Sequence, residues 1–249
     1  MIELKCIIEY SIDMKIKAIG FDLGNTLIYS EQSLNWSNNY KNALEKGFYS
    51  IKKMPTECDY NNCITILSKY NTRINPRENE VGSDQIFSEI MEILKLDLSE
   101  KELFENEFFR YFLQGNKLFD DTEEVLEDIK KQNLKTGILT DVPYGRVNGF
   151  VAEEIKPINR NIDIILSSVD IGYRKPNING YIMLAKKLET KTNEMVYVGD
   201  EEKDIIGANN AGIISILINR TDKKINYGEK YQFKNLREMW YNLRRQTFT

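Results

Sequence analysis

Polar side chains that could do chemistry together stand at the ends of apolar runs that lie far apart in this chain. Asp22 comes directly after residues 16–21, an apolar run broken only by Lys17, and Gly24 and Asn25 follow it as turn residues. The other groups are Thr140 with Asp141, Lys175, and Asp200 with Asp204. Each has a simpler interpretation as a turn, cap or surface residue. Their equivalent positions favour one shared crevice, because ligands of open α/β sheets bind at the carboxyl ends of the strands.

The residue types define the chemistry that such a crevice could perform. Several carboxylates close together repel one another and require a cation, and oxygen ligands at this density favour Mg²⁺ over zinc. A bound Mg²⁺ with a lysine would attract a phosphate dianion. A carboxylate in line with phosphorus can act as a nucleophile, and Mg²⁺, Lys and a Thr hydroxyl can stabilise the oxygens of the transferring phosphoryl group.

The composition narrows the possible functions. The 249 residues contain no histidine, which excludes catalysis and zinc binding by His. The net charge of −4, without a long basic run, argues against nucleic acid or an anionic membrane as the main partner. No apolar run approaches the ~20 residues of a membrane span, and the N-terminal residues do not read as a signal peptide. We therefore expect a cytoplasmic protein. Three cysteines, Cys6, Cys58 and Cys63, are too few for a disulfide framework.

Strand and helix patterns alternate on either side of a long helical segment. Apolar runs predict strands at 16–21, 134–139, 162–166, 195–198 and 213–218, and helical periodicity predicts helices at 121–132, 146–155, 178–188, 204–211 and near the C-terminus. This order is typical of an α/β fold, a Rossmann-like parallel sheet with helices on both faces. Alternation in residues 1–13 suggests an extra edge strand or an extension.

The segment from 29 to 117 has helical periodicity throughout. Its aromatic residues could line a ligand pocket, but packing between helices explains their spacing better. We expect Ser83 and Asp84 to cap one helix and a capping box at Ser99 to start another, with a polar loop at 71–82. The predicted domains are an α/β core of residues 1–28 and 118–249 and an inserted helical cap of residues 29–117. The cap could cover the strand ends as a lid.

Four short stretches in this order resemble the motifs of the haloacid dehalogenase-like (HAD) hydrolase superfamily: residues 21–27, 138–140, 175–176 and 198–204. The resemblance implies that Asp22 is the nucleophile, assisted by Thr140 and Lys175 as catalytic residues. The implied Mg²⁺ ligands are Asp22, the Gly24 carbonyl and Asp200, with Asp204 binding directly or supporting the others. The predicted substrate-binding residues are Asn25, Thr140, Asp141 and Lys175.

One position departs from the superfamily pattern. Most phosphatases of the group carry a second Asp two residues after the nucleophile as general acid and base, and this chain has Gly24 there. Such a group typically contributes ~10²–10⁴-fold in rate. Asp141 or a residue of the helical segment could replace it.

Three hypotheses follow for the function. The first is a Mg²⁺-dependent phosphohydrolase that acts on a small phosphorylated metabolite through an aspartyl-phosphate. The second is a non-catalytic or impaired member that binds a phosphorylated ligand or a protein partner. The third is another reaction on the same nucleophile, such as C–P or C–halogen cleavage. The sequence names neither the substrate nor the oligomeric state.

Overall fold

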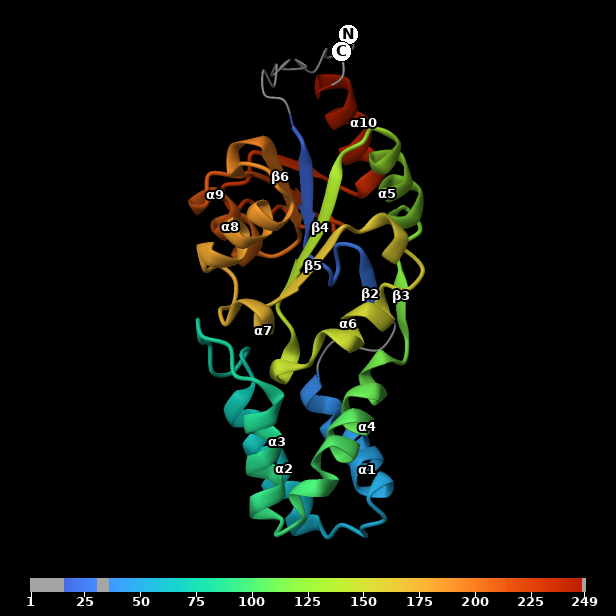
Figure 1. Cartoon of the computed structure of the whole chain (residues 1–249), viewed down its shortest axis with the longest axis vertical. Helices are drawn as coiled ribbons and strands as arrows, with labels where there is room; N and C mark the ends of the chain where they lie inside the picture. The colour runs from blue at the N-terminus through green and yellow to red at the C-terminus, as the bar shows by residue number, and fades with distance from the viewer. Residues whose placement is uncertain (1–15, 31–35, 248–249) are drawn as a thin grey trace.

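The computed structural model describes residues 16–30 and 36–247. The chain forms an α/β body and, beyond one end of its sheet, a body of helices (Figure 1). The edge strand expected within residues 1–13, and Cys6, lie outside the described residues. Cys58 and Cys63 are free thiols. Within the described part, every helix is too short or too polar to cross a membrane.

The central sheet is parallel and has the order β5-β4-β1-β6-β7-β8. Its strands are β1 (Ala18–Phe21), β4 (Lys135–Thr140), β5 (Ile164–Ser167), β6 (Met195–Gly199), β7 (Ile214–Ile218) and β8 (Tyr231–Phe233). Five of these confirm the strands expected from apolar runs. β8 was not expected, because its three residues are only partly buried or exposed.

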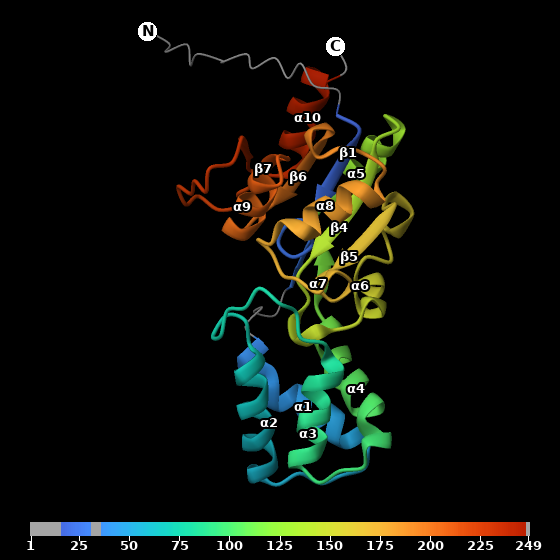
Figure 2. The same cartoon turned by 60° about the vertical axis from the view of Figure 1, so that its left-hand side comes forward.

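Helices cover both faces of the sheet, as the sequence predicts. α5 (Thr122–Lys131) and α10 (Leu236–Thr247) pack on one face, and α8 (Ile178–Lys187) and α9 (Glu202–Asn210) on the other (Figure 2). Alternate strand residues separate the two cores: Ile19 and Val198 belong to the first, and Ala18 and Tyr197 to the second. The short helices α6 (Asn148–Glu154) and α7 (Ser168–Ile171) follow β4 and β5.

The helical body consists of η1 (Trp36–Asn39), α1 (Tyr40–Ser50), α2 (Glu57–Tyr70), α3 (Ser83–Ile93), η2 (Leu98–Glu100) and α4 (Lys101–Leu113). Its aromatic side chains pack between the helices; Phe87, for example, meets Phe108 and Phe109 edge to face and Phe104 at a tilt. The expected packing role is therefore confirmed for these residues, whereas Trp36 and Phe112 also line a cavity.

Two predicted helix starts are wrong in detail. Ser83 is the first residue of α3, and Gly82 precedes it as the cap without a side-chain hydrogen bond. At the other start, the Asp97 side chain accepts the Ser99 amide and begins η2, so α4 starts only at Lys101. A nearby carboxylate therefore replaces the expected serine cap.

Two connecting segments of the chain and a set of side-chain contacts hold the helical body to the α/β body. The two connecting segments form the short antiparallel strands β2 (Ile28–Ser30) and β3 (Asn116–Leu118), which were not predicted from the sequence. In addition, Tyr144 and Phe150, which follow β4, belong to the aromatic cluster of the helical body. The helical body lies beyond the carboxyl ends of β1, β4 and β5, the end of the sheet that carries Asp22 (Figures 1 and 2).

Candidate active site

A cavity of about 910 Å³ lies between the carboxyl ends of the strands and the helical body. Asp22, Gly24, Thr140 and Lys175 line it from the α/β side. The helical side contributes aromatic, amide and basic residues, including Trp36, Tyr70, Asn71, Arg73, Arg77 and Phe112. Asp22, Thr140 and Lys175 therefore meet at one opening, which has room for a small molecule. Asp200 and Asp204 lie beside Asp22 but are not lining residues of the cavity.

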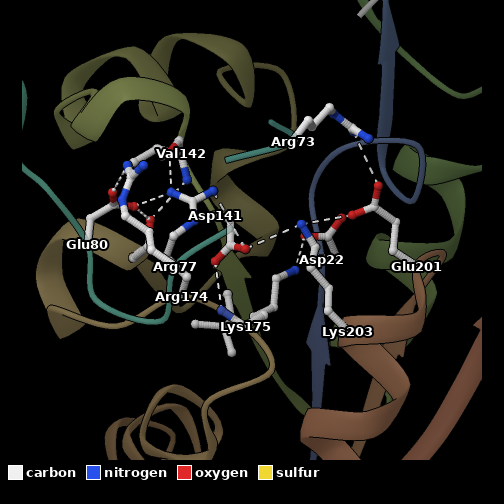
Figure 3. A network of polar contacts seen from close by, with 12 residues as sticks. Asp22, Arg73, Arg77, Glu80, Asp141, Val142, Arg174, Lys175, Glu201 and Lys203 are labelled. Atoms are coloured by element: carbon white, nitrogen blue, oxygen red, sulfur yellow. Dashed lines mark hydrogen bonds and ion pairs between the residues drawn. The ribbon is translucent and has the colours of Figure 1, made fainter. Parts of the chain in front are cut away.

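Lys175 lines this cavity and contacts two carboxylates, those of Asp22 (Figure 3) and Asp204. Its ammonium group donates to Asp22 Oδ1 and, at 2.6 Å, to Asp204 Oδ1. Burial opposes the charge on Lys175, but Asp204 and Asp22 outweigh this effect and raise its pKa well above the usual value. Lys175 is therefore a fixed positive charge beside the Asp22 carboxylate.

Asp22, Asp200 and Asp204 form a compact acidic cluster. Each offers an oxygen atom, and these three atoms lie within 4.8 Å of one another. Burial raises the pKa of Asp22 to about 6 despite Lys175. Burial and the charges of Asp22 and Asp204 raise the pKa of Asp200 to about 8. Lys175 alone thus leaves the cluster with unbalanced negative charge.

The local structure holds Asp204 in a supporting position. Its Oδ2 accepts the backbone N–H groups of Asp200 and Glu201, at 3.2 and 3.0 Å, while its Oδ1 accepts Lys175. Its side chain packs so closely on Gly199 that a Cβ there would lie 2.4 Å from the Asp204 Cβ. Asp204 is fully buried and both of its oxygens have protein partners. It therefore organises the turn that presents Asp200.

The turn after Asp22 brings Gly24 and Asn25 to the cavity wall. Asn25 adopts the left-handed conformation, with φ 55°, and its N–H donates to the Ile28 carbonyl at 2.7 Å. A Cβ added to Gly24 would meet no atom within 4 Å. The turn thus presents Gly24 to open space.

Thr140 and Asp141 end β4 at the same opening but have different surroundings. Thr140 lines the cavity. Asp141 Oδ1 accepts the Lys175 backbone N–H at 3.0 Å, and Oδ2 lies 3.3 Å from Lys203 Nζ. Burial favours the neutral form of Asp141, but Lys175, Lys203 and Arg174 prevail and lower its pKa. Asp141 therefore stays ionised, which makes it a poor general acid.

Several charged residues near the opening were not singled out by the sequence as site residues. Lys203 bridges Asp141 and Glu201, and Glu201 also pairs with Arg73 of the 71–82 loop at 3.3 Å (Figure 3). Glu201 and Lys203 belong to the stretch 198–204 that carried the resemblance. Arg73 lies in a polar loop without a motif, so the sequence held no signal for it.

The acidic cluster fits a hard divalent cation. Asp22 and Asp200 supply carboxylate oxygens, the ligands that Mg²⁺ prefers. Both oxygens of Asp204 already accept protein donors. A divalent charge here would offset the mutual repulsion that raises the pKa of Asp200. The donor set is therefore compatible with Mg²⁺.

Comparison with curated proteins shows modest similarity to phosphatases. Phosphoglycolate phosphatase of Yersinia pestis is 29% identical over 114 residues, which is 45% of this chain and 47% of that protein. Pyrophosphatase PpaX of Bacillus mycoides (strain KBAB4) is 26% identical over 114 residues, which is 46% of this chain and 52% of that protein. The similarity thus spans about half the length of these relatives.

Solved structures show the same fold along almost the whole chain. A 2-haloacid dehalogenase from Pseudomonas syringae pv. Tomato DC3000 aligns with a TM-score of 0.67 and 21% identity, covering 92% of this chain and 99% of that one. A HAD phosphatase from Thermococcus onnurineus aligns with a TM-score of 0.62 and 19% identity, covering 92% and 97%. The family profile described as haloacid dehalogenase-like hydrolase matches residues 19–218. This chain therefore belongs to the haloacid dehalogenase-like hydrolase family.

Proposed function

We propose that this protein is a Mg²⁺-dependent phosphohydrolase that cleaves a small phosphorylated metabolite through an aspartyl-phosphate at Asp22. The observation that carries the proposal is the meeting of Asp22 and Lys175 at one cavity, with Asp200 in the acidic cluster beside Asp22. The phosphatase relatives support the same class of reaction. The proposal also assigns residues 1–28 and 118–249 to the catalytic core and residues 29–117 to a cap.

The side chains divide the reaction between them. An oxygen of Asp22 attacks phosphorus, and the bond from phosphorus to the leaving oxygen breaks, with the electron pair going to that oxygen. Lys175 and the Thr140 hydroxyl hold the phosphoryl oxygens. Water then cleaves the acyl phosphate, which releases inorganic phosphate and restores the carboxylate. Asn25 contacts the substrate beside the nucleophile, and Asp141 holds the backbone of Lys175 in place.

Asp22, Asp200 and the Gly24 carbonyl would hold Mg²⁺, with Asp204 supporting Asp200 and Lys175. When bound, Mg²⁺ would offset the charge of the carboxylates and polarise the phosphoryl oxygens. Asp141 is a poor replacement for the general acid that is missing at Gly24, because its pKa is lowered. We therefore expect slow turnover, or turnover that depends on the leaving group of the substrate.

Asp22→Asn tests the nucleophile. With an aryl phosphate and Mg²⁺, we expect kcat to fall at least about 10³-fold, because an amide cannot form the acyl phosphate. Asp128→Asn is the matched control, since the Asp128 side chain lies at the surface in an ion pair with Lys131. Turnover that survives in Asp22→Asn would refute the assignment.

Because Gly24 stands where most phosphatases of the family have a general acid, there is a second candidate function: binding a phosphorylated ligand without hydrolysing it. Beryllium trifluoride with Mg²⁺ mimics a phosphoryl group on a carboxylate and separates the two possibilities. A catalytic site should trap it at Asp22 in the wild-type protein and not in Asp22→Asn. Binding of phosphate esters without trapping or turnover would favour the second function.

A further inference from the structure

The 71–82 loop of the helical body crosses to the α/β body and pairs with the segment just before Lys175. The Glu80 N–H donates to the Gly172 carbonyl at 2.9 Å, and the Arg174 N–H donates to the Glu78 carbonyl at 2.7 Å. Asn79 and Tyr173 face each other as an antiparallel bridge. The helical body is therefore hydrogen-bonded to the loop that carries the lysine.

The Glu80 side chain completes this junction. Its carboxylate is 2% exposed and accepts four donors: the Arg174 guanidinium, the Ser168 hydroxyl at 2.5 Å, the Val81 N–H at 2.8 Å and the Arg77 guanidinium at 3.2 Å (Figure 3). A buried carboxylate with this many donors holds its neighbours far more firmly than a surface ion pair does. Ser168 and Arg174 lie on the α/β side of the junction, and Arg77 lies on the helical side.

Arg174 extends the junction toward the nucleophile. Its guanidinium also donates to the Val142 carbonyl at 2.9 Å and lies 3.7 Å from Asp141. Asp141 in turn accepts the backbone N–H of Lys175, whose ammonium group contacts Asp22. An unbroken series of polar contacts therefore runs from Glu80 to the nucleophile (Figure 3).

A second close contact keeps the same loop in register. Gly145, which follows β4, has φ +64°, and a Cβ there would lie 2.3 Å from the Val81 carbonyl oxygen and 2.4 Å from the Ser83 nitrogen. Backbone therefore packs directly on backbone beside Glu80. The loop cannot shift without disturbing the segments that follow β4 and β5.

We propose that Glu80 is a positioning residue for Lys175, so that the helical body sets the place of the phosphate-binding lysine. The proposal rests on the proposed function for its catalytic consequence. Glu80 acts through Arg174 and the 172–175 backbone and does not itself touch the substrate. A displaced lysine would still attract phosphate by its charge, but it would no longer align with Asp22 and the transferring group.

Hydrogen exchange tests the junction without relying on activity. In Glu80→Gln, the amides of residues 80, 174 and 175, which donate to Gly172, Glu78 and Asp141, should exchange at least tenfold faster, while those of β6 stay unchanged. Glu78→Gln is the matched control, because the Glu78 side chain is exposed and only its carbonyl takes part. Equal exchange in the two variants would overturn the proposal, whether or not the protein hydrolyses phosphate esters.

Kinetics test the positioning role. We expect Glu80→Gln to lower kcat about 10- to 100-fold with KM changed less than threefold, because geometry is lost and charge is kept. Glu78→Gln should match the wild type. If the wild type has no phosphatase activity, the proposed function fails, and the exchange experiment alone decides the role of Glu80.

A second substitution, at Arg174, separates the effect of Glu80 on the position of Lys175 from its effect on the stability of the protein. Glu80→Gln leaves the buried Arg174 less well compensated, which itself lowers stability. The variant Glu80→Gln/Arg174→Met removes both charges and should regain melting temperature while exchange at residues 174 and 175 stays fast and kcat stays low. Recovery of both stability and kcat would show that Glu80 only neutralises Arg174, and the proposal would fail.

Discussion

At the residue scale, the site has a candidate nucleophile, Asp22, but a glycine, Gly24, where a general acid is expected. Asp22 has a fixed cation, Lys175, on one side and the acidic cluster on the other. Gly24 presents only backbone to the cavity wall, and Asp141 is held ionised by its basic neighbours. In the proposed reaction, neither Gly24 nor Asp141 is suited to protonate the leaving oxygen.

Gly24→Asp should restore that step. A Cβ at this position would meet no atom within 4 Å, so the backbone leaves room for a side chain to start. We expect kcat to rise about 10- to 100-fold with an alkyl phosphate, and less with an aryl phosphate whose leaving group needs no proton. Gly24→Ala is the matched control, since it adds the Cβ without the carboxyl group. Steady-state rates with the two substrates give the measurement, and unchanged rates would mean that the missing acid does not limit turnover.

At the element scale, two glycines decide where α9 lies and hence where the acidic cluster forms. Gly199 leaves room for Asp204, and Gly207 lets the Tyr181 ring pack against α9. The Tyr181 hydroxyl then donates to the carbonyls of Lys203 and Asp204, at 3.0 and 3.2 Å. The first turn of α9 is thus held from both α8 and β6.

Gly207→Ala should therefore destabilise the protein. Its Cβ would lie 2.2 Å from the Tyr181 ring, which is fully buried and has no room to move, so we expect a loss of about 1–3 kcal/mol in the free energy of unfolding. Gly149→Ala in α6 is the control: its Cβ would meet nothing, and removing a helical glycine should gain up to about 1 kcal/mol. Urea denaturation measures both changes. Equal stability of the two variants would contradict the packing argument.

At the scale of the whole molecule, folding concentrates negative charge that the protein alone does not balance. Asp22 and Asp200 come from β1 and the end of β6, which are neighbours in the sheet although 178 residues separate them in the chain. Burial raises the pKa values of both, Asp204 adds to the shift of Asp22, and Asp22 and Asp204 add to that of Asp200. A ligand that removes this repulsion binds only the folded chain and so stabilises it.

Mg²⁺ should accordingly raise the melting temperature. At a concentration 100 times its Kd, binding contributes about 2.7 kcal/mol, or roughly 5–10 °C for a chain of this size. A chelator should reverse the shift, and Asp200→Asn should abolish it, while Asp128→Asn should keep it. Thermal unfolding with and without Mg²⁺ gives the measurement. A shift that persists in Asp200→Asn would place the ion elsewhere.

The order of strands and helices, and the positions of Asp22, Thr140 and Asp200 at strand ends, could be read from the chain because buried parallel strands are continuous apolar runs. The short strands β2, β3 and β8 could not be predicted in this way. Each has only three residues, too few for a pattern, and the pairing partner provides most of the order.

The sequence by itself determined the fold class and the residue types available for phosphoryl transfer. Only the tertiary structure decided which charges meet: that Asp204 is held by Lys175 and two backbone amides, that Asp141 is surrounded by cations, and that Glu80 reaches Arg174 from the helical body. The physical reason is that polar contacts between distant loops leave no periodic pattern in the chain. They arise only where packing of the two bodies removes water from both partners.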